Sequence, residues 1–484
     1  MEGLVYFSLS KIANLILERK ISAIEVLEIH LKQIAKYNTK INAIILLDEE
    51  QARQKAKAAD QALANNEIWG PLHGVPFTVK DSYATKNLCS SFGNPLHKNY
   101  VPDFDATLVA RIKDAGAILL GKTNLPDFSF DWQINKALFG RTSNPYNLDH
   151  IVGGSSGGSA AALASGFTPI CLGSDIAGSL RVPAHCCGIT TIRPTEQALS
   201  DFGHFKLPDQ PKLGRHMVTC GPMARTVEDL KFIYPLLWGS DPNNWSIAPV
   251  ELKNTPPVTT LKGLRIAYST TLGNTPTCKD TKKAFDDFLG QLNSAGCELK
   301  EAQPKNFDVD YMQEIWGIIC GAGDFRASLP RFIPKLLPKL WLLSKFSRSK
   351  FTNTLIKGIN SSRRDLMFAL EKRDSLIQSA NEFFSSYDIW ITPVGATPAF
   401  KHCKTGAVVP VDDKTLPYSD IFSPFNCPTA ILANPIVVIP IAFSLQGLPI
   451  GIQIHGKRWQ DWRLLEIAEL METITGGFKK PQNM

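Results

Sequence analysis

The stretch that decides how this chain folds and works is Gly153-Gly154-Ser155-Ser156-Gly157-Gly158-Ser159, with Asp175-Ile176-Ala177-Gly178-Ser179-Leu180-Arg181 after it. From Gly153 to Ser179 there are seven glycines and one charged residue, Asp175. Glycine lets the backbone approach a ligand closely and tolerates positive φ. Serine hydroxyls and peptide N–H groups on such a loop can face a reacting atom. The stretch therefore predicts a serine nucleophile, its proton relay and its oxyanion hole.

The composition is ordinary for a soluble globular protein. Of the 484 residues, 44% are hydrophobic and 20% are charged, which allows one large α/β domain. The ten cysteines show no framework spacing, which is typical of reduced thiols in an intracellular protein. We see no signal peptide at the N-terminus and no apolar run of about 18 residues. We therefore expect a cytoplasmic protein.

The positive charge of the chain is concentrated in one segment. Residues 325–364 contain ten basic residues and no acidic one, while the net charge of the whole chain is +7. The remainder has 42 basic and 45 acidic residues, a net charge of −3. A general nucleic-acid interface is therefore not expected, and the basic excess needs a local explanation.

Hydrophobic periodicity predicts helices that alternate with buried strands. Spacings of three and four residues indicate amphipathic helices over 8–37, and the composition of 49–64 indicates another helix. Short apolar runs predict strands at 117–120, 169–173, 388–393, 433–440 and 448–454. This alternation is typical of an α/β protein.

Lys80 ends a short apolar run, Phe77-Thr78-Val79-Lys80. Burying an ammonium group is costly, so the favoured interpretation of this residue alone is a lysine at the exposed end of a strand. The alternative is a buried lysine whose pKa is lowered by desolvation, so that it can act as a base. The immediate surroundings of Lys80 do not decide between the two.

Other chemistries fit the glycine-rich stretch less well. Residues 154–158 match the G-x-S-x-G elbow of α/β-hydrolases, but a polar stretch precedes them where that motif needs a strand. The phosphate-binding patterns G-x-x-x-x-G-K-[ST] and G-x-G-x-x-G are missing from it. His185-Cys186-Cys187 has no partner pair at zinc spacing. We expect no metal and no cofactor.

Several motifs, in order along nearly the whole chain, resemble the amidase signature family. The signature itself is 153–161 with 174–181. Further matching segments are Gly74-Val75-Pro76-Phe77-Thr78-Val79-Lys80-Asp81, Gly121-Lys122-Thr123-Asn124, Asn144-Pro145-Tyr146-Asn147, Gly221-Pro222-Met223-Ala224-Arg225 and Gly447-Leu448-Pro449-Ile450-Gly451-Ile452-Gln453. The resemblance implies one α/β domain over 1–484, with a mixed sheet of about ten strands and helices on both faces. Within it we expect N-terminal helices over 8–64, a signature core over 70–235 and a basic, apolar helical insertion over 325–364.

The resemblance also implies a Ser-cisSer-Lys triad. Ser179 would be the nucleophile, Ser155 the relay after a cis peptide bond, and Lys80 the base. The backbone N–H groups of the oxyanion hole would be those of Ile176, Ala177, Gly178 and Ser179. Ser156, Asp175 and Arg181 would support the site. Ala177 stands where the family commonly has glycine; its methyl group can narrow the site but leaves the N–H intact.

The substrate expected from the resemblance is a small-molecule amide. Phe128-Ser129-Phe130-Asp131 resembles the acyl-channel region of fatty acid amide hydrolases, so Phe128, Phe130 and Trp132 are candidate substrate contacts and the acyl group is expected to be apolar. Residues 325–364 either touch an anionic membrane peripherally or only cover the pocket. Three further possibilities stay open: a homodimer, an A-type amidotransferase component that works on a glutaminyl substrate with partner subunits, and a catalytically idle binding protein.

Overall fold

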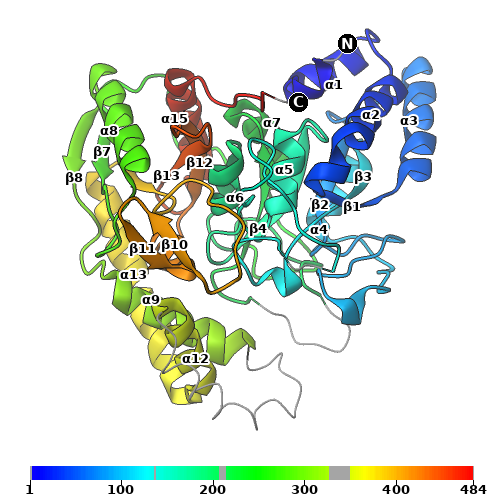
Figure 1. The fold of residues 1–484 in the computed structure, drawn as a ribbon. Coiled ribbons are helices and arrows are strands. Elements are labelled where there is room, and N and C mark those ends of the chain that lie inside the picture. The colour runs from blue at the N-terminus through cyan, green and yellow to red at the C-terminus, as the bar shows by residue number, and fades with distance from the viewer. Residues whose placement is uncertain (1–2, 136–137, 207–213, 326–348, 483) are drawn as a thin grey trace.

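The computed structural model describes residues 3–135, 138–206, 214–325, 349–482 and 484. In these ranges, eleven strands form one mixed sheet in the order β1-β3-β2-β4-β6-β5-β12-β13-β9-β7-β8 (Figure 1). A separate hairpin pairs β10 (Val408–Val411) with β11 (Lys414–Pro417). The sheet strands are β1 (Ile44–Leu47), β2 (Pro76–Lys80), β3 (Ile118–Thr123), β4 (Ile170–Asp175), β5 (Thr190–Arg193), β6 (Thr219–Ala224), β7 (Arg265–Tyr268), β8 (Glu298–Glu301), β9 (Ile389–Pro393), β12 (Ile436–Phe443) and β13 (Pro449–His455). The α/β fold with a mixed sheet is confirmed.

Several helices begin at capping residues that the sequence indicates. Ser22 and Glu25 form the predicted capping box of α2, and the Thr226 hydroxyl accepts from the Asp229 N–H at the start of α7. The predicted helix over 49–64 is α3. The α-helices of the described ranges are α1 (Leu9–Leu17), α2 (Ala23–Ile41), α3 (Glu49–Ala64), α4 (Thr107–Asp114), α5 (Gly157–Ala164), α6 (Arg181–Cys187), α7 (Val227–Leu237), α8 (Lys279–Ser294), α9 (Val309–Ile318), α12 (Lys350–Asn360), α13 (Arg363–Ser386), α14 (Ser423–Ile431) and α15 (Asp461–Thr475).

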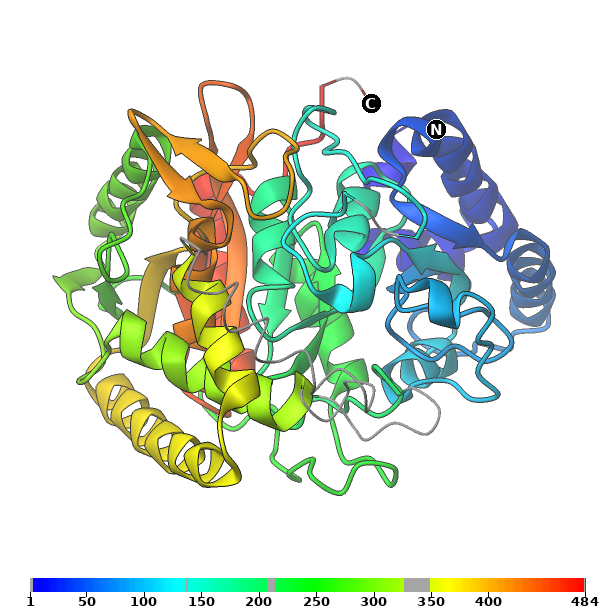
Figure 2. The same cartoon turned by 60° about the horizontal axis from the view of Figure 1, so that its bottom comes forward.

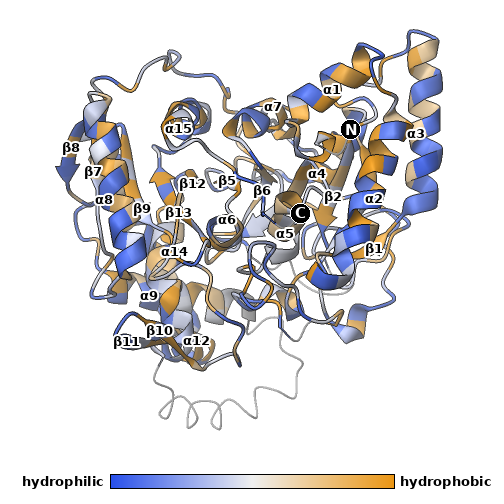
Figure 3. Cartoon of the chain, turned by 45° about the horizontal axis from the view of Figure 1, so that its top comes forward, coloured by the Kyte–Doolittle hydropathy of each residue, from blue (hydrophilic) through white to orange (hydrophobic). Residues whose placement is uncertain are grey.

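Helices cover both faces of the sheet. The helices α7, α8 and α15 pack on one face, and α5 and α6 pack on the other (Figure 3). Apolar residues are concentrated on the central strands, while α3 and α8 carry many hydrophilic residues on the outside (Figure 3). The small residues of α5 are all buried. This close packing explains why small residues, mainly alanine and glycine, fill the helix after Ser156.

The strand β1 was not predicted, because the sequence interpretation gave 8–64 to helices. It is an edge strand that pairs antiparallel with β3. Its sequence, Ile-Ile-Leu-Leu, is a four-residue apolar run between two helices. Periodicity cannot distinguish so short a run from part of a helix.

The helices α9, α12 and α13 lie outside the layers of the sheet (Figure 2). The helix α12 packs against α9. Most of the predicted basic insertion, residues 326–348, lies outside the described residues; its described end forms α12 and the start of α13. No helix within the described ranges is both long and apolar enough to cross a membrane.

Candidate active site

Two parallel strands bring the base and the signature loop together. The strands β2 and β4 are neighbours in the sheet, so their carboxyl ends meet at one edge, where ligands bind in many α/β sheets. Lys80 is the last residue of β2 and Asp175 the last of β4. The Lys80 Nζ donates to Ser155 Oγ at 2.7 Å and to Ser174 Oγ at 3.1 Å, and the side chain is fully buried. The interpretation of Lys80 as an exposed strand end is therefore wrong.

Burial changes the acid–base chemistry of Lys80. Desolvation of the ammonium form lowers the pKa of Lys80 from 10.5 to about 7, although the nearby Cys220, Asp175 and Cys171 act in the opposite direction. A large share of the side chains is then the free amine at neutral pH. A free amine beside the Ser155 hydroxyl can accept its proton.

The loop that carries Ser155 and Ser156 passes tightly between other segments. The Gly154–Ser155 peptide bond is cis. A Cβ at Gly154 would lie 2.3 Å from the Asp131 carbonyl oxygen, so only glycine fits there. The Ser156 hydroxyl donates to the Ser174 carbonyl and accepts from the Ser174 N–H, both at 3.3 Å, and the Ser156 N–H donates to the Ser179 carbonyl at 3.1 Å. Through these hydrogen bonds, Ser156 connects the loop of Ser155 to the loop of Ser179.

Asp175 holds the loop of Ser179 in shape. Its carboxylate accepts from the N–H groups of Gly178 at 2.9 Å and Leu180 at 3.0 Å. Gly178 has φ of +94°, a conformation that favours glycine. The Gly178 N–H is therefore already used within the loop, whereas those of Ala177 and Ser179 donate to no acceptor in the described part of the chain. Ala177 and Ser179 also line the adjacent cavity.

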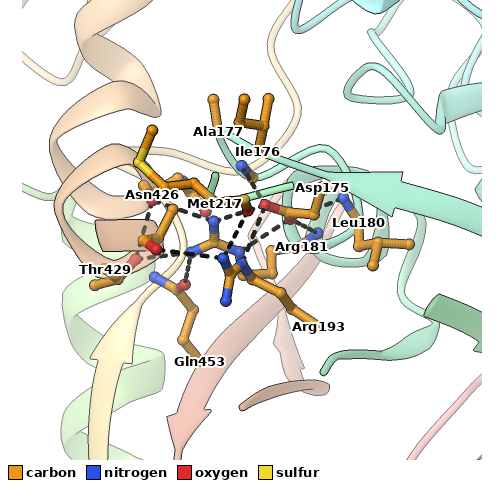
Figure 4. A network of polar contacts seen from close by, with 12 residues as sticks. Asp175, Ile176, Ala177, Leu180, Arg181, Arg193, Met217, Asn426, Thr429 and Gln453 are labelled. Atoms are coloured by element: carbon orange, nitrogen blue, oxygen red, sulfur yellow. Dashed lines mark hydrogen bonds and ion pairs between the residues drawn. The ribbon is translucent and has the colours of Figure 1, made fainter. Parts of the chain in front are cut away.

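Asp175 is itself paired with two buried arginines (Figure 4). Arg181 Nη2 lies 2.9 Å from Asp175 Oδ1, and Arg193 Nε lies 3.7 Å from the same oxygen. Burial would raise the pKa of Asp175, but the Arg181 guanidinium and then Arg193 hold it at about 2. Arg181 Nη1 also donates to Thr429 Oγ1 and Gln453 Oε1, both at 2.7 Å. This network ties the signature loop to α14 and β13.

A cavity of about 500 Å³ lies beside Ser179. Of the three predicted substrate contacts, Phe130 and Trp132 line it, whereas the Phe128 ring packs edge-on against His97 and is not among the described lining residues. The other apolar and aromatic lining residues are Ile176, Ala177, Trp316, Phe351, Leu355, Val408, Pro417 and Tyr418. Ala177 lies in the cavity wall, and the effect of its methyl group on the site stays a prediction.

Several site residues were missed by the sequence interpretation. Ser174 receives a hydrogen bond from Lys80; it stands at the start of the signature segment 174–181, but it was given no role. Arg193, which pairs with Asp175, was given no role. Trp316 and Phe351 come from α9 and α12, more than 130 residues after Ser179. No local pattern marks a residue that reaches the site only through the fold.

The chain is similar to known proteins over nearly its whole length. The family model described as Amidase matches residues 25–465. The A component of the glutamyl-tRNA(Gln) amidotransferase of Geobacillus thermodenitrificans (strain NG80-2) is 30% identical over 492 residues, which cover 98% of each chain.

Solved structures share the fold over nearly the whole chain. An inhibitor-bound vestigial protein complex, described as revealing the evolutionary origins of an s-triazine catabolic enzyme, matches with a TM-score of 0.81 and 26% identity over 97% of this chain and 99% of that one. A fatty acid amide hydrolase matches with a TM-score of 0.80 and 21% identity over 98% of this chain and 86% of that one. The family model and the motifs around Lys80, Ser155 and Ser179 together lead to one conclusion: this chain belongs to the amidase signature family of hydrolases.

Proposed function

We propose that this protein hydrolyses a carboxylic acid amide through an acyl-enzyme on Ser179. The observation that carries the proposal is the 2.7 Å contact between the Lys80 Nζ and the Ser155 hydroxyl, deep in the core and next to the loop of Ser179. A serine hydroxyl is a weak nucleophile unless a base takes its proton. A buried lysine with a pKa of about 7 is suited to that task.

The proposed reaction has two halves. Ser179 Oγ attacks the amide carbonyl carbon, its proton passes to Ser155 Oγ, and the Ser155 proton passes to Lys80 Nζ. The proton then returns by the same route to the leaving nitrogen as the C–N bond breaks, which releases ammonia or an amine. Water attacks the ester on Ser179 in the second half, with the relay working again, and releases the carboxylate.

The negative oxygen of each tetrahedral intermediate would lie against the N–H groups of the signature loop. We assign this role to the N–H groups of Ile176, Ala177 and Ser179. Gly178, which was expected to contribute as well, gives its N–H to Asp175 in the free protein. Removal of one such donor typically lowers kcat by about 10² to 10³.

We propose an apolar acyl group for the substrate. The support is the wall of the cavity beside Ser179, where Phe130, Trp132, Trp316 and Phe351 offer aromatic surface. Apolar surface removed from water contributes about 25 cal/mol per Å² to binding. Amides with long or aromatic acyl groups should therefore have a higher kcat/KM than the acetyl amide.

A panel of amides with one leaving group tests this function. The acyl groups would run from acetyl through octanoyl and benzoyl to palmitoyl, and release of ammonia would be measured for the wild type and Ser179→Ala. We expect hydrolysis that depends on Ser179 and is fastest for the larger apolar acyl groups. Best turnover on acetamide would exclude the apolar substrate, and turnover that survives Ser179→Ala would exclude the nucleophile.

A second candidate function is that of an amidotransferase component. It is favoured by the full-length similarity to the A component of glutamyl-tRNA(Gln) amidotransferase. Such a component would release ammonia from glutamine only together with partner subunits and tRNA. A catalytically idle protein would turn over no amide and would leave Ser179 unreactive. Efficient hydrolysis of simple amides by the isolated chain would exclude both.

A further inference from the structure

Two buried tryptophans donate hydrogen bonds to consecutive carbonyl groups of the signature loop. The Trp316 Nε1–H donates to the Ile176 carbonyl at 3.1 Å, and the Trp132 Nε1–H donates to the Ala177 carbonyl at 3.0 Å. Trp316 lies on α9, whereas Trp132 follows β3. Both side chains are buried, with 1% and 6% of their surface exposed. The mechanism above uses neither indole N–H.

Each of these carbonyls belongs to a peptide group that also carries a loop N–H. The Ile176 carbonyl shares its peptide plane with the Ala177 N–H, and the Ala177 carbonyl shares its plane with the Gly178 N–H. In a trans peptide the two groups point in opposite directions. A donor fixed on the carbonyl therefore fixes the direction of the N–H, and it also polarises that N–H toward a stronger hydrogen bond.

The two peptide groups differ on their N–H side. The Gly178 N–H donates to Asp175 at 2.9 Å, and the Ala177 carbonyl accepts from Trp132. Both polar groups of this peptide are therefore hydrogen-bonded within the protein. The Ala177 N–H donates to no acceptor in the described residues, and Ala177 is one of the residues that line the cavity. The bond from Trp316 thus supports a peptide group whose N–H has no acceptor in the described residues, at a residue of the cavity wall.

We propose that Trp316 and Trp132 are positioning residues of the oxyanion hole, with Trp316 the more important. This inference rests on the proposed function. Trp316 aims the Ala177 N–H at the negative oxygen that forms on the substrate. Trp132 holds the next peptide group against Asp175, which keeps the loop from rotating out of place. Both act through the backbone and transfer no proton themselves.

The same two rings also form the wall of the acyl cavity. Trp132 meets Phe351 with ring centroids 4.8 Å apart, and Trp316 meets Phe351 at 5.3 Å. An acyl group in the cavity therefore rests on the rings whose N–H groups hold the oxyanion loop. The two roles can be separated, because the ring binds the acyl group while the indole N–H acts on the loop.

The test uses Trp316→Phe and Trp132→Phe, which keep an apolar ring and remove the N–H. For the amide that the wild type hydrolyses best, we expect kcat to fall about tenfold in Trp316→Phe and less in Trp132→Phe, with KM within about twofold of the wild type. A trifluoromethyl ketone with the same acyl group adds to Ser179 as a tetrahedral oxyanion. Its affinity should fall by the same factor as kcat.

Trp238→Phe is the matched control. The Trp238 indole also donates to a backbone carbonyl, that of Val250 at 2.8 Å, but Trp238 does not line the cavity. This variant should keep the wild-type kcat, and thermal melts of all three variants would compare their stability. Unchanged kcat and unchanged ketone affinity in Trp316→Phe would overturn the inference, as would a rise in KM alone. If the wild type itself hydrolyses no amide, the proposed function fails, and this inference fails with it.

Discussion

Lys80 illustrates how burial changes the chemistry of one side chain. From the sequence, an exposed strand end was the more economical interpretation, because a buried ammonium is costly. The fold places Lys80 in the core, where the hydroxyls of Ser155 and Ser174 are its hydrogen-bond partners. Burial therefore favours the neutral amine over the ammonium form, and a lysine must be neutral to accept a proton as a general base.

This environment predicts the pH dependence of the reaction. Because the pKa of Lys80 is lowered to about 7, the amine is protonated below that pH and free above it. We expect kcat/KM to rise with pH through about 7 and then to level off. Initial rates between pH 5 and 10 on a substrate without ionisable groups would measure this. An ascending limb centred near 10.5 would mean that Lys80 keeps its ordinary pKa and is not the base.

At the residue scale, motifs in the sequence were enough to propose a triad, but they do not explain how its residues would work. Lys80, Ser155 and Ser179 were found through motifs, and the cis peptide bond before Ser155 is present. The environment that lowers the pKa of Lys80 comes from residues distant in the sequence. The use of the Gly178 N–H by Asp175 depends on loop geometry, which the pattern of small residues does not specify.

The signature loop between β4 and α6 depends on one buried carboxylate. Asp175 accepts from two loop N–H groups and faces Arg181 and Arg193, all without contact with solvent. Removing one partner from a buried ion pair typically costs about 3–5 kcal/mol, because the other charge stays buried and uncompensated. The loop that presents Ser179 should therefore be sensitive to this single side chain.

The variant Asp175→Asn tests this dependence. We expect its free energy of unfolding in urea at pH 7 to fall by about 3–5 kcal/mol. The control, Asp286→Asn, removes an exposed ion pair with Lys282 on α8 and should change stability only marginally. Because the pKa of Asp175 is lowered to about 2, its stabilisation is present above the ordinary value of 3.8 and is lost as the pH falls through 2. Equal stability of the two variants at pH 7 would contradict this account.

On the scale of the whole molecule, the sheet assembles the site from distant parts of the chain. Lys80 comes from β2, Ser174 from β4, Ser155 from the loop before α5, and Trp316 from α9. The alternation of helices and strands was enough to predict an α/β fold. The edge strand β1 and the contact of α9 with the signature loop could not be predicted, because one is too short for a periodic signal and the other is set by tertiary packing.

The basic segment 325–364 stays a proposed membrane contact. In its described part, Lys350 and Lys357 pair with Asp310 and Glu314 of α9 at 2.7 Å. These two cations are thus partly neutralised, and the others would have to carry the binding. Met367 and Phe368 on the adjoining turns of α13 are exposed by 60% and 48%. Apolar side chains beside basic ones are typical of peripheral binding to anionic surfaces.

Co-sedimentation with liposomes tests this contact. We expect weak binding to vesicles that contain phosphatidylserine and no binding to neutral vesicles. Binding to the anionic vesicles should be lost as salt rises from about 50 to about 500 mM, because the electrostatic attraction is then screened over a shorter distance. Combined Arg363→Gln and Arg364→Gln should reduce it. Absence of binding to anionic vesicles at low salt would leave 325–364 only the role of covering the pocket.

In the proposed reaction, Ser179 is the nucleophile, and Ser155 and Lys80 activate it. The most direct measurement is labelling of the isolated chain with a fluorophosphonate, followed by peptide mass spectrometry to locate the adduct. We predict one adduct, on Ser179. Labelling should be lost in Ser179→Ala and slowed by a factor of about 10² or more in Lys80→Ala. The control variant Ser159→Ala, which replaces a buried serine of α5 outside the triad, should still be labelled on Ser179. An adduct on Ser155, or no labelling of the folded wild-type chain, would contradict the account.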